Sequence, residues 1–208
     1  MFKKVLVLSP HTDDGELGAG GTINKLISNG CSVDYVAFSA AEDSVPSGFD
    51  KNILRTEVLK ATMVLGIQKE NVTVLSYKVR TFPSHRQQIL DDLINIRKKK
   101  DYDLILTPST MDIHQDHKTV TEEAIRAFKH ITILGYELIW NNLKSDSTSF
   151  IKLDADNINA KSLAMSEYKS QSGRSYTSNE FIKSLSRTRG VQIGTEYAEC
   201  FEVIRLIL

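Results

Sequence analysis

The 208 residues are enough to enclose the core of one α/β domain, and a hydrophobic content of 41% with 25% charged residues is ordinary for a globular protein. The 26 basic residues balance the 26 acidic ones, so charge gives no argument for nucleic acid or an anionic membrane surface as a partner. A helix needs about 20 apolar residues to span a bilayer, and the apolar runs of this sequence are far shorter. We therefore expect no membrane-spanning helix.

The first strand is predicted at residues 5–8, within "MFKKVLVLSPHTDD". Its apolar run is shorter than the roughly 7–15 residues of a signal-peptide core, so a buried strand is the better interpretation. Cys31 and Cys200 lie far apart, and without a secretory signal they are expected to be reduced core thiols. These features favour a cytoplasmic protein.

Strand-like and helix-like segments then alternate along the first two thirds of the chain. Further strands are predicted at 31–40, 72–77 and 102–110, with helices at 20–30, 52–67, 84–100 and 117–130. A strand at 133–140, helices at 154–171 and 179–190, and a late strand at 199–208 follow. Such alternation predicts a single Rossmann-like α/β domain over residues 1–208, with a mainly parallel sheet and helices on both faces.

Two stretches lack periodicity and are rich in small and polar residues. They are Ser39–Asp50 and Ser170–Asn179. Each is interpreted either as a lid over a site or as a solvated loop, and the sequence leaves both alternatives open.

Two polar clusters follow strands of this predicted sheet. "HTDD" supplies His11, Asp13 and Asp14 after the first strand, and "MDIHQDH" supplies Asp112, His114, Asp116 and His117 after the fourth. Ligands of parallel α/β sheets bind outside the carboxyl ends of the strands, so both clusters are expected at one edge of the sheet. Either cluster alone fits an ordinary turn or helix cap, but the pair predicts an active site there.

Imidazole and carboxylate side chains together are a natural ligand set for a divalent metal. Two histidines and one aspartate would leave a coordination position open, as in catalytic zinc sites. A dinucleotide-binding loop is a poorer interpretation, because Ile23 stands where the last glycine of the fingerprint belongs and the loop is acidic. The facial triad of non-haem iron oxygenases fits His11 and Asp13, but the alternation of strands and helices is unlike the barrels of those enzymes.

With these motifs in place, the sequence resembles the PIG-L/LmbE-like N-deacetylases, a family of zinc-dependent enzymes. The resemblance rests mainly on "PHTDDGELGAGGTI" and "HQDH", with support from "RTEVLKATMVLG", "KSLAMSEYKSQ" and "YAECF". It implies a Zn²⁺ cofactor, with Fe²⁺ as an alternative. It also implies a small N-acetylated amino sugar or glycoconjugate as substrate, and an oligomer of identical chains.

The resemblance further implies roles for six residues of the clusters. His11, Asp14 and His117 look like the metal ligands, Asp13 resembles the general base, and His114 resembles the residue that faces the developing oxyanion. Asp116 is expected to orient His114 through a hydrogen bond. The expected reaction is removal of an N-acetyl group by water.

A few other side chains carry weaker expectations. Arg55, just after the loop 39–50, is the best candidate for holding a substrate hydroxyl or phosphate, although Arg55 and Glu57 could also form a helix-surface pair. Trp140 is expected in the core or at an interface, with stacking on a sugar ring as the alternative. His85 is expected at the surface or at a helix cap, and Glu199 in a structural role. Two other functions remain open: an amidase for a non-sugar N-acyl substrate, and a sugar-binding protein without catalysis.

Overall fold

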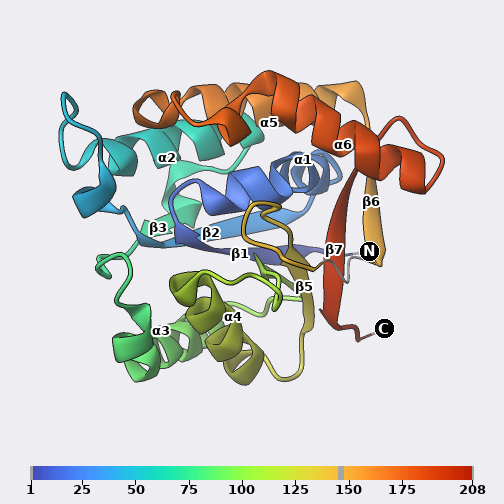
Figure 1. Cartoon of the computed structure of the whole chain (residues 1–208). Coiled ribbons are helices and arrows are strands. Elements are labelled where there is room, and N and C mark those ends of the chain that lie inside the picture. Colours follow the sequence, from blue (N-terminus) through green and yellow to red (C-terminus); the bar gives the residue numbers. More distant parts are fainter. Residues whose placement is uncertain (1, 145–147, 208) are drawn as a thin grey trace.

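The computed structural model describes residues 2–144 and 148–207, and their strands form one seven-stranded sheet (Figure 1). The strand order is β3-β2-β1-β4-β5-β7-β6. The first five are parallel, namely β1 (Lys4–His11), β2 (Ser32–Ser39), β3 (Val72–Val74), β4 (Leu104–Pro108) and β5 (Thr132–Tyr136). β7 (Tyr197–Arg205) runs antiparallel between β5 and β6 (Ser149–Leu153). The predicted mainly parallel sheet is confirmed.

Helices cover both faces of the sheet, as predicted. Figure 1 shows α1 (Asp14–Ser28), α2 (Ile53–Leu65), α5 (Ala155–Ser166) and α6 (Asn179–Gln192) above it, and α3 (Arg86–Lys99) and α4 (Gln115–Ala127) below. In β1, Val5 and Val7 pack into the upper core, while Leu6 and Leu8 pack into the lower one. A strand buried on both faces is apolar at every position, which explains the continuous run "VLVL".

The strand order creates the position of the site. From β1 the chain moves outward through β2 to β3, and it then returns to the other side of β1 to form β4. The connections leave the sheet in opposite directions at the carboxyl ends of β1 and β4. This reversal is the switch point at which open α/β sheets bind ligands.

α1 is bent at Ala19, whose φ of −141° is not helical. Beside the bend, Gly18 lies against the ring of Tyr136, and a Cβ there would stand 2.2 Å from Tyr136 Cδ2. The second half of the helix is held by Glu199 of β7, which pairs with buried Lys161 at 2.6 Å and accepts two backbone N–H groups, those of Gly21 and Thr22. Glu199 therefore has a structural contact, as expected.

Several predicted boundaries were wrong. The helix predicted from residue 20 begins at Asp14, because the bend joins a glycine-rich first half to the periodic second half. β6 was not predicted at all, since it is a five-residue edge strand in which only Leu153 is fully buried. The last strand begins at Tyr197, and β7 lies inside the sheet.

The other differences concern lengths. β3 covers only the first part of the predicted strand 72–77, and the helix predicted at 154–171 ends at Ser166. None of the helices in the described part of the chain combines the length and apolar character that crossing a bilayer requires.

Candidate metal and active site

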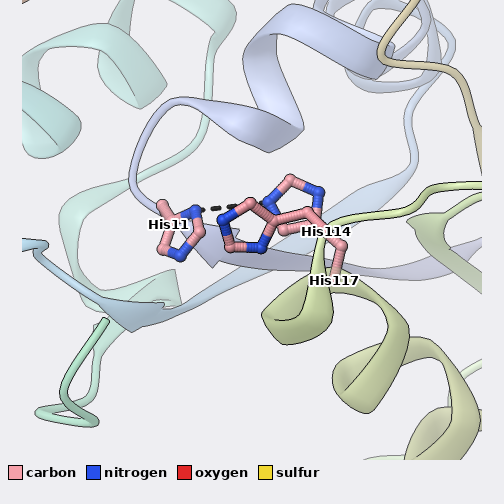
Figure 2. Close-up of side chains that lie close together, drawn as sticks. All are labelled: His11, His114 and His117. Carbon is pink, nitrogen blue, oxygen red and sulfur yellow. Dashed lines mark hydrogen bonds between the residues drawn. The ribbon is translucent and has the colours of Figure 1, made fainter. Parts of the chain in front are cut away.

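The two polar clusters meet at the carboxyl ends of β1 and β4. His11 is the last residue of β1, and Asp14 is the first residue of α1. His114 is the N-cap of α4, and His117 lies in its first turn. Figure 2 shows the three imidazole rings side by side, with a dashed line joining His11 to His117.

Three ligand atoms of this cluster form a triangle with equal sides. His11 Nδ1 lies 3.2 Å from Asp14 Oδ2, His117 Nε2 lies 3.2 Å from the same oxygen, and the two nitrogens are 3.2 Å apart. In a tetrahedral zinc site with bonds of about 2.0 Å, neighbouring ligand atoms stand about 3.3 Å apart. The residues that the sequence singled out therefore fit a small divalent cation.

His114 offers a second possible ligand set. One nitrogen from each of His11, His114 and His117 lies within 4.8 Å of the other two. The set with Asp14 has the shorter distances and includes an anionic ligand. His114 Nδ1 also accepts a hydrogen bond from the backbone N–H of Asp116 at 3.2 Å, so only its Nε2 would be available to a metal.

His11 and His117 belong to both possible ligand sets, and each of them contacts a carboxylate on its other ring nitrogen. Asp112 Oδ2 lies 2.8 Å from His117 Nδ1, and Asp116 Oδ2 lies 3.0 Å from His11 Nε2. Carboxylates in this position fix the ring orientation and the tautomer of a metal-binding histidine. Asp112 was part of the predicted cluster but had no role; its position five residues before His117 was the available signal.

The expected role of Asp116 needs a correction. Its carboxylate binds His11 and accepts the backbone N–H groups of Arg80 (2.5 Å) and Phe82 (3.2 Å). Toward His114 it offers only its backbone N–H. The sequence could not distinguish these partners, because they come from different loops that only the fold brings together.

The adjacent carboxyls Asp13 and Asp14 are in different environments. Burial raises the pKa of Asp13, and the neighbouring Asp14 raises it further. Burial also acts upward on the pKa of Asp14, but His117 and His11 outweigh it and the net shift is downward. Asp13 is 8% exposed, and the charges of Arg174 and His11 act against these two effects without reversing them. One carboxyl is thus suited to bind a cation, and the other to accept a proton.

The two α4 histidines also differ. Burial would lower the pKa of His117, but Asp14 and Asp112 raise it to about 10. Burial and the neighbouring His117 lower the pKa of His114. Because Nδ1 of a neutral His114 accepts the Asp116 N–H, its proton belongs on Nε2, which makes His114 a hydrogen-bond donor.

A buried polar cluster fixes the backbone of the "HTDD" turn. The hydroxyls of Tyr35 and Tyr168 both contact the Thr12 carbonyl and the Glu16 carboxyl. Burial raises the pKa of Glu16 to about 8, although the hydrogen bonds from both tyrosines act in the opposite direction. The turn that carries Asp13 and Asp14 is therefore held on its buried side by side chains of β2 and of the segment after α5.

The site opens into a cavity of about 280 Å³, close to the lower end of the range for small-molecule pockets. Besides the clusters, its wall includes Ala41 and Ser44 of the loop 39–50 and Gln171, Arg174 and Tyr176 of the segment 170–179. Both stretches without periodicity thus border the site. Their movement as lids stays a prediction.

The placement of two other residues differs from what the sequence suggested. Arg55 does not line the cavity: its guanidinium binds Glu42 at 2.8 Å and the carbonyls of Val74 and Leu75, so it anchors the loop 39–50. Trp140 lies on the cavity wall, 37% exposed, with its ring stacked 4.0 Å from that of Tyr176. Neither difference is visible in sequence, because both depend on loop paths.

The fold and the site together define an α/β protein with a candidate metal centre of histidines and aspartates at the switch point of its sheet. A model of one family, described as "PIG-L: GlcNAc-PI de-N-acetylase", matches residues 6–128. The chain belongs to this PIG-L family, as its motifs had suggested.

Individual relatives extend the comparison. Over 124 residues the chain is 28% identical to diacetylchitobiose deacetylase of Thermococcus kodakarensis, covering 56% of this chain but only 45% of that protein. The N,N'-diacetylchitobiose deacetylase structure from Pyrococcus horikoshii has a TM-score of 0.78 at 22% identity, covering 98% of this chain and 84% of the other. GalB, the 4-carboxy-2-hydroxymuconate hydratase of Pseudomonas putida KT2440, has a TM-score of 0.80 at 17% identity, with 99% and 98% covered. The same fold therefore also occurs in a hydratase.

Proposed function

We propose that this protein is a metal-dependent hydrolase that removes the N-acetyl group of an N-acetylglucosamine-type sugar or its conjugate. The observation that carries the proposal is the equilateral set of ligand atoms beside the buried Asp13 carboxyl. Membership of the PIG-L family and the similarity to chitobiose deacetylases support the choice of an N-acetylated sugar.

His11, Asp14 and His117 would hold the metal, with Zn²⁺ as the first candidate and Fe²⁺ as the second. A bound divalent ion supplies an acidified water, with its pKa lowered from ~15.7 toward ~7, and polarises the amide carbonyl. Asp112 and Asp116 keep the two imidazoles in the tautomers that expose His117 Nε2 and His11 Nδ1 toward Asp14.

Asp13 accepts the proton of the attacking water at its carboxylate. Its raised pKa makes the carboxylate a better base than an exposed aspartate, and its buried position on the cavity wall brings it close to the reacting group. The same carboxyl can later return the proton to the departing amine. His114 donates a hydrogen bond from Nε2 to the negative oxygen of the tetrahedral species, in the way of an oxyanion-hole donor.

The test combines metal analysis with acetate release from a panel of N-acetylated sugars and non-sugar amides. Asp13→Asn is expected to keep the metal and lose most turnover, because the amide cannot accept a proton. Asp14→Asn is expected to lose the metal. His114→Gln separates the two ligand sets: retained metal with slow turnover supports the set with Asp14, whereas loss of metal supports the set of three histidines.

Other results would point to other functions. Metal with activity only on non-sugar amides would identify an amidase, and sugar binding without metal or turnover would identify a binding protein. Metal with hydration of an unsaturated acid in place of acetate release would match the chemistry of the hydratase that shares this fold. Retained metal in Asp14→Asn together with loss in Asp13→Asn would reverse the roles of the two carboxylates.

A further inference from the structure

The loop after β5 contains two neighbouring asparagines that differ in their contacts. Asn142 Oδ1 accepts the backbone N–H of Leu138 at 3.1 Å and so closes the turn of the loop. Asn141 lies on the cavity wall and is half-buried. Its side-chain amide forms no hydrogen bond with any residue in the ranges 2–144 and 148–207. One asparagine therefore builds the loop, while the amide of the other is available to a ligand.

The backbone of Asn141 is held on both sides. Its N–H donates to the Leu138 carbonyl at 2.8 Å, and its carbonyl accepts the N–H of Ile113 at 3.1 Å. An antiparallel bridge joins Asp112 to Asn142 beside this bond. Because both backbone groups of Asn141 are already paired, its side chain extends from a fixed frame, as a precise binding group requires.

Aromatic packing adds a further anchor to this loop. The ring centres of Trp140 and Tyr176 are 4.0 Å apart, and the Phe181 ring of α6 lies 6.2 Å from Trp140. Such ring contacts contribute beyond the area that they bury, and they tie the loop to two later segments of the chain. Asn141 is thus ordered before a ligand arrives, so binding costs little further entropy.

The same contacts place Asn141 beside the reacting end of the cavity. Ile113, which donates to the Asn141 carbonyl, directly precedes His114. Both Asn141 and His114 line the cavity, and His114 faces the amide oxygen in the proposed reaction. A substrate group that binds Asn141 is therefore expected close to the amide, on the ring that carries it.

The chemistry of the Asn141 side chain suits a hydroxyl. A primary amide offers two N–H donors and a carbonyl acceptor without net charge, so it can both donate to a hydroxyl and accept from it. A compound without a hydroxyl at this point would exclude water from Asn141 and leave its polar atoms unpaired. Sites built to hydrogen-bond a substrate hydroxyl disfavour such compounds for this reason.

We infer that Asn141 is a specificity-determining residue that binds a hydroxyl of the sugar ring carrying the N-acetyl group. The inference rests on the proposed function and adds the contact by which the site distinguishes an amino sugar from other N-acetyl compounds.

The experiment compares kcat/KM of the zinc-loaded wild type and of Asn141→Ala for N-acetylglucosamine and for its 1-deoxy, 3-deoxy, 4-deoxy and 6-deoxy analogues. The wild type is expected to lose about 3–10-fold toward one analogue, the factor that one neutral hydrogen bond implies. Asn141→Ala should lose the same factor toward N-acetylglucosamine and nothing further toward that analogue, because the interacting pair is already broken. Unchanged kcat/KM in Asn141→Ala, or losses that simply add for every analogue, would overturn the inference.

Two controls use the same residue type. Asn95→Ala removes an exposed amide of α3 outside the cavity and should leave every kcat/KM value unchanged. Asn142→Ala should lower the urea midpoint, because it removes the contact with Leu138. The midpoint and the zinc content of Asn141→Ala should equal those of the wild type. A lower midpoint in Asn141→Ala would show that its amide serves the fold and would overturn the inference.

A binding measurement separates this inference from the proposed function. Calorimetry on the wild type and on Asn141→Ala measures the binding of glucosamine and its deoxy derivatives, which contain no amide to cleave. Weaker binding of one deoxy derivative, with the difference lost in Asn141→Ala, supports the inference even if no compound releases acetate and the proposed function fails. Acetate release without coupling to Asn141 in either measurement would overturn the inference and leave the hydrolase standing.

Discussion

Asp112 provides the sharpest test of how the site is built. The carboxylate is 3% exposed and accepts two hydrogen bonds, from His117 Nδ1 and from the backbone N–H of His114, both at 2.8 Å. In Asp112→Asn only one oxygen remains. Whichever way the amide turns, its NH₂ group faces one of the two donors. The variant therefore either leaves His117 without its partner or loosens the turn that starts α4.

The magnitude follows from these contacts. Loss of a hydrogen bond to a charged group costs about 1.5–3 kcal/mol, and removal of a carboxylate behind a metal-binding histidine costs about 10–100-fold in metal affinity. The two figures agree, since a factor of 10–100 corresponds to about 1.4–2.7 kcal/mol. We expect Asp112→Asn to bind Zn²⁺ weaker by that factor, with a matching loss of turnover at limiting metal.

The assay is competition for Zn²⁺ with a chromophoric chelator, accompanied by urea unfolding of the chelator-treated protein. Glu202→Gln is the matched control: Glu202 accepts the backbone N–H of Thr110 in the same loop at 2.7 Å but contacts no candidate ligand. Its metal affinity should equal that of the wild type. Unchanged affinity in Asp112→Asn, or an equal loss in Glu202→Gln, would refute the role of Asp112 as the partner of His117.

Three further predictions concern the frame of the site. Gly18→Ala places a Cβ against the Tyr136 ring and should lower the free energy of unfolding by about 1–3 kcal/mol; a urea midpoint equal to the wild type's would contradict the tight contact. Glu199→Ala leaves Lys161 buried without its partner and should cost about 3–5 kcal/mol in the same measurement, whereas a loss below 1 kcal/mol would mean that water reaches the lysine. Arg55→Gln should speed proteolytic cleavage within residues 39–50, because Arg55 ties that loop to Glu42 and to β3. A changed affinity for a sugar ligand with unchanged cleavage would instead restore Arg55 as a substrate-binding residue.

The sequence predicted the sheet well where its strands are buried on both faces. Such strands are apolar at every position, and the alternation with helices fixes their direction, so β1, β2 and β4 could be predicted from local patterns. It failed for β6 and for the first half of α1. β6 is stabilised by its pairing with β7, and α1 is bent around Tyr136, which lies more than a hundred residues further along the chain.

The candidate residues of the site could be predicted from the sequence alone. His11, Asp13, Asp14, His114, Asp116 and His117 follow strand ends at spacings that already indicated metal chemistry, because a strand end fixes the residues that come next. Which carboxylate holds which histidine was decided by the tertiary structure, as was the placement of Trp140, Arg80 and Arg174 on the cavity wall. Such contacts join loops whose paths depend on packing across the whole sheet, and no local pattern of residues encodes that packing.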